Sequence, residues 1–292
     1  MTVNASRIEA RRKRRQREAR VMQLIMASAL VLVVAGLFLI LGVIVARGIG
    51  TISWTMLTEV PKGGSYSGGG GGIANSILGS LYLAIGGTLL ALLLGLPIAL
   101  YLNAYAGRSR FAGWVRLSLD VMWGIPSLLY GAFGFAIMIA VGLRASLLAG
   151  IITLAVVELP IMTRGMDEVL RLTPRDLHHG TLALGATRWE LMGILLRQAL
   201  PGLFTATLLA FGRGIGDAAA VLFTAGYTDR IPTSLTSATA SLPLTVFFQL
   251  QTPYEASKAR AYAAALVLTV IVLLVSVVAR IVRARVGANV VR

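Results

Sequence analysis

The feature that most constrains this chain is a series of long segments that lack charged side chains. The first, Val21–Ala46, contains no acidic or basic residue and is too long for the apolar core of a secretory signal. A helix rises about 1.5 Å per residue, so this segment can cross the roughly 30 Å hydrocarbon core of a bilayer. Five further apolar segments follow, at residues 73–106, 121–142, 145–163, 199–227 and 261–279. The sequence therefore predicts an all-α membrane protein with six transmembrane helices.

Composition supports this class and excludes others. Hydrophobic residues make up 57% of the chain and charged residues 13%, with a mean hydropathy of +0.80, which soluble domains do not reach. The absence of cysteine rules out disulfides and thiolate metal sites. The only histidines, His178 and His179, are adjacent, so on a helix they point about 100° apart and are poorly placed to share a metal. We expect both to be solvated loop residues.

The distribution of positive charge predicts the orientation in the membrane. The formal net charge is +15, and residues 1–20 form a basic arm directly before the first span. A nucleic-acid-binding arm is the alternative, but the adjoining span favours an arm lying near the membrane. The other arginine-dense segments are residues 108–116, 164–198 and 280–292. With six spans all of them fall on one side, so the N- and C-termini are predicted to be cytoplasmic.

These boundaries give the expected organisation of the chain. We expect a cytoplasmic arm at 1–20, a transmembrane domain at 21–285 and a cytoplasmic tail at 286–292. The glycine-rich residues 47–72 are interpreted as an external linker, since no Lys-Ser/Thr follows them as in a phosphate-binding loop. Residues 228–260 form a second external segment, and its apolar part at 240–247 can lie at the membrane interface or enter it.

The longest charged segment between spans begins with the signals of a short helix. Thr173 can cap it, Pro174 suits its first position, and Asp176 is favourable in its first turn. One face of this helix is predicted to carry Leu177, Thr181 and Leu184.

A sharp break and a second helix follow. Gly185 can adopt the left-handed conformation that ends a helix, and Thr187 with Glu190 forms a capping box for the next one. Pro201 is predicted to mark the junction with the fifth span. The cytoplasmic segment at 164–198 therefore contains two short helices and a turn.

The fifth span contains two ionisable residues, which indicates function. Arg213 and Asp217 are four residues apart, so in a helix they share a face and can pair. Charged groups at this depth cost several kcal/mol unless paired or hydrated, and they usually mark a pathway. A purely structural ion pair is the alternative. Glycines at 212, 214 and 216 allow another backbone or a substrate to approach closely.

The cytoplasmic segment resembles the coupling loop of ABC-importer permeases. Its glycine spacing and downstream Leu-Pro match that loop, while His179-Gly180-Thr181 stands where the family has an acidic residue and two alanines. In that family the loop docks into a cleft on the ATP-hydrolysing subunit. The resemblance implies that the docking residues here are His179, Gly180, Thr181, Ala183, Leu184, Gly185, Ala186, Trp189 and Pro201.

The segment at 212–225 is similar to the fifth span of PstA-type permeases of phosphate importers. Arg213 matches the family arginine, Asp217 replaces its glutamate, and Ala220 replaces its proline. Arg164 falls where the family has another functionally implicated arginine. The segments at 71–81 and 124–131 agree as well. The resemblance implies a substrate pathway that contains Arg213, Asp217 and Arg164.

The resemblance also implies the fold, the activity and the partners. The fold is that of a type I ABC importer permease, in the cytoplasmic membrane of a bacterium. The chain is expected to translocate inorganic phosphate without being an enzyme and without holding a cofactor. ATP and Mg²⁺ are bound by a dimer of partner ATPase subunits, and an extracytoplasmic binding protein delivers the solute to this chain and a second, PstC-like permease. Another oxyanion, such as sulfate, molybdate or a phosphonate, is the alternative cargo. A secondary transporter or channel is the alternative class, and no binding of nucleic acid is expected.

Overall fold

The computed structural model describes residues 2–62, 70–107 and 109–287. Within these ranges the chain is helical, and the only extended pairing is an isolated bridge between Pro61 and Gly71. The helices are α1 (Thr2–Gly48), η1 (Ile49–Thr51), α2 (Trp54–Thr58), α3 (Ala74–Tyr101), η2 (Leu102–Ala106), α4 (Arg110–Gly124), α5 (Ser127–Ala140), α6 (Leu147–Arg171), α7 (Arg175–Ala183), α8 (Arg188–Gly214), α9 (Leu242–Leu250) and α10 (Glu255–Gly287). The all-α prediction is confirmed.

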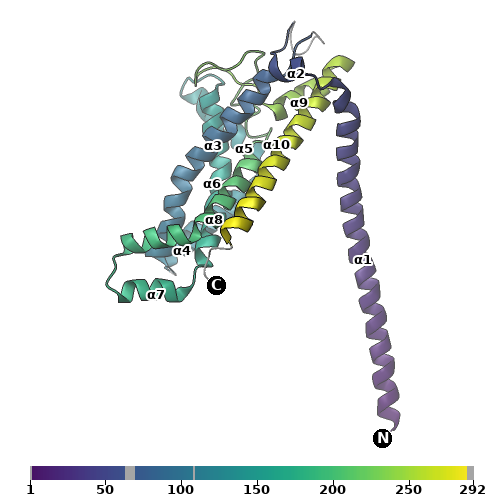
Figure 1. Cartoon of the computed structure of the whole chain (residues 1–292), viewed down its shortest axis with the longest axis vertical. Coiled ribbons are helices and arrows are strands. Elements are labelled where there is room, and N and C mark those ends of the chain that lie inside the picture. Colours follow the sequence, from purple (N-terminus) through teal and green to yellow (C-terminus); the bar gives the residue numbers. More distant parts are fainter. Residues whose placement is uncertain (1, 63–69, 108, 288–292) are drawn as a thin grey trace.

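The long helices form a bundle in which α6 is the best-covered element. α6 lies against α3 along its length and also contacts α4, α5 and α8. Small residues permit the close α3–α6 contact, because a Cβ at Gly87 would come within 3.1 Å of the Leu154 side chain. Figure 1 shows α2 and α9 at one end of the bundle, and α7 at the other end together with the N- and C-termini. This arrangement agrees with both termini and the coupling segment lying on one side.

Helix α1 stands apart from this bundle over most of its length (Figure 1). Its most apolar stretch has no buried residue, and the arm and the first span form one helix, so the boundary predicted between residues 20 and 21 falls inside α1. The helix is held at its far end, where Gly48 packs on the backbone of Tyr262 and Arg47 donates to the Tyr262 hydroxyl over 3.2 Å. The apolar surface of α1 is therefore left for lipid or for another chain.

The third span differs from the prediction of a single helix at 121–142. Two helices, α4 and α5, meet there at 97°. Proline 126 explains the break, because a residue before proline is pushed out of the helical region, and Ile125 is extended at φ −75° and ψ 130°. Among the described residues, five helices are long and apolar enough to cross a membrane, or six if the bent pair is one span.

The fifth span also differs. Helix α8 begins in the cytoplasmic segment and runs through Pro201 without interruption, so the predicted junction at Pro201 was wrong. The span ends early, at Gly214, and residues 215–225 continue as turns. Those turns are buried: Ala220, Val221 and Ala225 pack with Leu83 of α3 and Leu154 of α6 in one hydrophobic cluster. The point at which α8 ends and the turns begin, called the α8 break below, therefore lies inside the protein.

Candidate substrate pathway and coupling surface

The predicted charged pair lies at the break of α8. Arg213 is in its last turn, whereas Asp217 stands in the turns that follow, so the two do not share a helical face as predicted. They still pair, with Arg213 Nη2 3.9 Å from Asp217 Oδ2. The Asp217 side chain is 5% exposed and that of Arg213 is 55% exposed. The carboxylate is thus fixed in the protein, while the guanidinium remains open to a ligand.

The turns that hold Asp217 are fixed from several directions. Asp217 Oδ1 accepts a hydrogen bond of 3.0 Å from the backbone N–H of Ala220. Gly131 of α5 lies against the carbonyl oxygen of Ala219, leaving no room for a side chain. Farther along, the N–H of Ser146 donates to the carbonyl of Thr224 over 2.9 Å. These contacts hold the non-helical backbone in place beside α5 and α6.

A second carboxyl group lies beside the same break, and its place there was not predicted. Glu158 of α6 is fully buried, and its Oε2 accepts a 2.8 Å hydrogen bond from the Thr88 hydroxyl of α3. Its Oε1 has no hydrogen-bond partner among the described residues. That oxygen occupies the place that a Cβ at Gly214 would take. Glycine at 214 therefore allows α8 to end directly over the Glu158 carboxyl.

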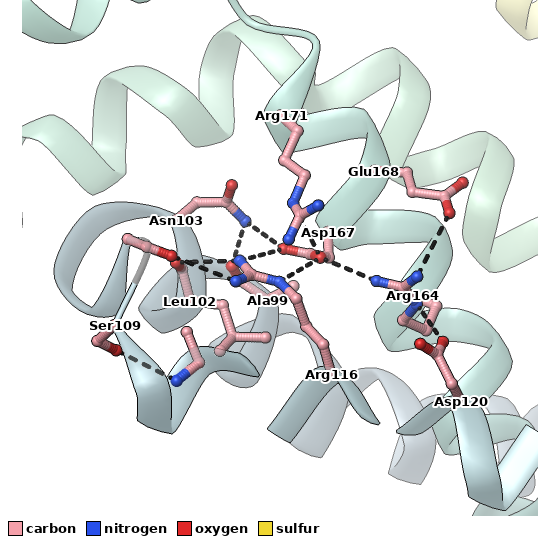
Figure 2. Close-up of polar contacts among 12 residues, drawn as sticks. Ala99, Leu102, Asn103, Ser109, Arg116, Asp120, Arg164, Asp167, Glu168 and Arg171 are labelled. Carbon is pink, nitrogen blue, oxygen red and sulfur yellow. Dashed lines mark hydrogen bonds and ion pairs between the residues drawn. The ribbon is translucent and has the colours of Figure 1, made fainter. Parts of the chain in front are cut away.

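A cluster of ionised side chains lies nearer the cytoplasmic end of α6 (Figure 2). Its centre is Asp167, which is fully buried and accepts hydrogen bonds from Arg116 of α4, at 2.9 and 3.0 Å, and from Asn103 of η2 at 2.9 Å. Arg171 approaches the same carboxylate to 3.2 Å. Arg116 also donates to the carbonyl groups of Leu102 and Gly107. One carboxylate thus joins α6 to η2 and α4.

Arg164 belongs to this cluster in the structure. Its Nε lies 2.7 Å from Asp120 of α4, and its Nη1 lies 3.4 Å from Asp167. It is six residues beyond Glu158 on α6, or about 9 Å along the helix axis. The three residues predicted for the pathway are therefore not brought together: Arg213 and Asp217 meet, and Arg164 lies with other partners.

The coupling segment has the two helices and the turn that were predicted. Gly185 has a φ of +83°, and Thr187 and Glu190 form the capping box of α8. The expected cap at Thr173 was wrong, because its hydroxyl donates to the carbonyl of Leu170 and Pro174 holds the N-cap position. Of the residues predicted to share one face, Thr181 is buried, whereas Leu184 follows the last residue of α7 and is 90% exposed.

The exposed residues of this segment surround a hollow of about 640 Å³. Trp189 is 72% exposed beside Leu184, although large apolar side chains are usually covered. The hollow is lined by Leu184, Gly185, Ala186, Trp189, Glu190, Gly193, Ile194 and Arg197. The structure thus presents a hollow with a mixed apolar and charged lining at the end of the molecule that carries both termini.

Comparison with known proteins agrees with this geometry. Residues 87–288 match the family described as binding-protein-dependent transport system inner membrane component. The phosphate transport system permease protein PstA of Yersinia pestis is 33% identical, covering 98% of this chain and 97% of its own. PstA of Xylella fastidiosa strain Temecula1 is 35% identical over 72% of this chain and 74% of its own. The probable ABC transporter permease protein YqgI of Bacillus subtilis is 31% identical over 69% of this chain and 67% of its own.

The fold is shared with a solved ABC transporter. Inward-facing structures of the MetNI methionine ABC transporter include a chain that superposes with a TM-score of 0.59 at 21% identity, covering 75% of this chain and 96% of that chain. The fold is thus that of a type I ABC-importer permease, a multi-pass membrane protein. This chain belongs to the family of inner-membrane components of binding-protein-dependent transport systems. Within that family its full-length similarity is to PstA.

The structure adds residues that sequence reasoning did not select. Glu158 was not selected, although a carboxyl group within an apolar segment is itself a signal of function. Asp167 was missed altogether. Its spacing of three residues from Arg164 and four from Arg171 indicates an ion-pair network along one helical face.

The contact of Gly214 with Glu158 can be tested by adding one methyl group. We expect Gly214→Ala to destabilise the protein by about 1–3 kcal/mol, because the Cβ overlaps the Glu158 carboxyl. The matched control is Gly212→Ala, whose Cβ would meet only Val275 at 3.9 Å. The measurement is the thermal unfolding temperature of the purified complex. Glu158→Ala should restore the stability of Gly214→Ala, and equal stability of the two glycine variants would contradict the packing.

Removing the single charge of Asp167 is expected to lower the stability of the protein strongly. Asp167→Asn leaves Arg116 and Arg171 without their carboxylate, and losing one partner of a buried pair typically costs about 3–5 kcal/mol. The control is Glu168→Gln, one residue away, whose side chain is 64% exposed. We expect a marked fall in unfolding temperature and yield for Asp167→Asn alone. Equal behaviour of the two variants would mean that the cluster does not hold the helices together.

Proposed function

We propose that this chain is a permease subunit of an ATP-driven importer in the bacterial cytoplasmic membrane and that its cargo is inorganic phosphate. The observation that carries this proposal is the half-exposed Arg213 held beside the buried Asp217 at the break of α8. A guanidinium stays charged and offers a planar set of donors that matches two oxygens of a phosphate. The similarity to PstA over nearly the whole chain supports the same cargo.

The pathway is proposed to contain Arg213, Asp217 and Arg164, as the sequence predicts. Asp217 holds Arg213 while no anion is present, and an arriving anion competes for the guanidinium. Arg164 acts nearer the cytoplasm, where Asp120 and Asp167 keep it in place. Other oxyanions, such as sulfate, molybdate or a phosphonate, share this chemistry and form the second candidate cargo. The exposed coupling surface argues against a channel or secondary transporter, which needs no such docking site.

The partners follow from the surfaces that this chain leaves open. The hollow beside Leu184 and Trp189 is proposed to receive one subunit of an ATPase dimer. That dimer binds ATP and Mg²⁺, so this chain itself holds no cofactor. A second, PstC-like permease is proposed to cover part of the apolar surface of α1, and an extracytoplasmic binding protein delivers the phosphate. Capture of the solute falls to that protein.

Docking can be tested at Gly185, where a Cβ would meet nothing within 4 Å of this chain. Gly185→Leu is expected to abolish most ATPase stimulation by the binding protein. The left-handed conformation disfavours a side chain by about 1–2 kcal/mol, and the leucine obstructs the surface. The control is Gly113→Leu, an equally open glycine in α4. Normal assembly and stimulation in Gly185→Leu would mean that the segment is only a connector.

The role of the charged pair is tested by comparing a single and a double variant. Arg213→Gln should reduce uptake of radiolabelled phosphate by roughly ten- to a hundredfold while the complex still assembles, because an amide hydrogen-bonds but carries no charge. The control is Arg144→Gln, an exposed arginine in the turn between α5 and α6. If the pair is only structural, adding Asp217→Asn removes the unpaired charge and restores uptake, which would refute the proposed role.

A further inference from the structure

A cavity separate from the α8 break lies at the cytoplasmic end of the bundle. Its volume is about 560 Å³, within the range of roughly 300–1,000 Å³ that is usual for small-ligand sites. Five elements enclose it: η2, α4, α6, α7 and α8. The lining residues are Leu102, Asn103, Gly107, Arg116, Leu170, Arg171, Thr173, His178, His179 and Leu195. None of these described residues is acidic.

Two arginines are held in the wall of this cavity by Asp167. Arg116 is fixed through bonds to the carboxylate and to two carbonyl groups, and its side chain is 14% exposed. The Nε atom of Arg171 lies 3.2 Å from Asp167 Oδ2, and the Arg171 side chain is 47% exposed. Its two terminal nitrogens make no hydrogen bond to another described residue. The wall therefore carries two cations for one buried anion, and part of one guanidinium is unused.

The two histidines complete the wall from α7. Their ring centroids lie 6.0 Å apart, and neither ring is hydrogen-bonded within the described part of the chain. Both histidines were expected in a loop, but they lie in α7, where His178 is half-buried and His179 is exposed. Burial lowers the pKa of His178, and neighbouring His179 and Arg188 lower it further by disfavouring another positive charge. An imidazole ring offers at least one N–H donor in either protonation state.

We propose that this cavity binds a phosphate group, carried either by orthophosphate in the cytoplasm or by an anionic phospholipid headgroup. Guanidinium and imidazole N–H groups are the donors that a phosphate oxygen requires. Leu102, Leu170 and Leu195 supply an apolar side that suits the glycerol part of a headgroup. Helix α4, which carries Arg116, also exposes Trp114 and Phe111, side chains typical of the membrane interface. The inference does not depend on the identity of the transported anion.

The test is equilibrium binding to the detergent-purified transporter without its binding protein. The probes are radiolabelled orthophosphate and dioctanoyl phosphatidylglycerol, with dioctanoylglycerol as the lipid that lacks phosphate. We expect Arg171→Gln and His178→Gln each to weaken binding by about tenfold, the loss of one charged or strong hydrogen bond. The matched control is Arg280→Gln, which removes an exposed cation from the cytoplasmic end of α10. His178→Gln leaves the Asp167 cluster intact, so it remains informative if Arg171→Gln is unstable.

The outcomes separate the two phosphate sources and the two sites. Binding of orthophosphate that phosphatidylglycerol does not displace assigns the cavity to the free anion, whereas binding of the lipid alone assigns it to a headgroup. Failure of both probes to bind, or equal binding by every variant, overturns the inference. Binding that is lost in Arg213→Gln but kept in Arg171→Gln belongs to the transport pathway. That last result would reject the cavity while supporting the proposed function.

Discussion

The buried Asp167 carboxylate is the interaction on which the cytoplasmic half of this protein depends. A lone charge in that position would be costly, and arginines from two helices remove the cost by surrounding it (Figure 2). Because Arg116 comes from α4, the ion pair fixes how α4 crosses beneath α6. Because Arg171 is the last residue of α6, the cluster also holds the end of the helix that leads into α7. The proposed docking surface lies beyond that point in the chain.

The local features were predictable from sequence because their causes are local. The capping box of Thr187 and Glu190 and the left-handed Gly185 depend on residues within one turn of each other. The apolar runs likewise predicted which segments form membrane-crossing helices, but not the bend in the third span or the early end of the fifth. The bend at Pro126 was predictable in principle from the proline, but the apolar run across it hid the break.

The remaining site features depend on contacts between distant parts of the chain. The Arg116–Asp167 pair joins residues 51 positions apart, and the Thr88–Glu158 hydrogen bond joins residues 70 apart. No periodicity in a single sequence encodes such pairs. The end of α8 at Gly214 likewise depends on contacts between distant parts of the chain. Helix spacing predicted that Arg213 and Asp217 share a face, whereas packing against Glu158 and α5 favours a turn there.

Helix α8 is continuous from the capping box to Gly214, a length of 27 residues or about 40 Å. Trp189 stands near one end and Arg213 near the other, so the proposed docking surface and the side chain proposed to meet the anion belong to one helix. Two separate helices joined at Pro201 could bend relative to each other at that point when one of them is displaced. A continuous helix moves as one body, so a displacement of its first turn is passed on to the turns at residues 215–225. In the proposed function, those turns are the place where a movement of α8 would alter the pairing of Arg213 with Asp217.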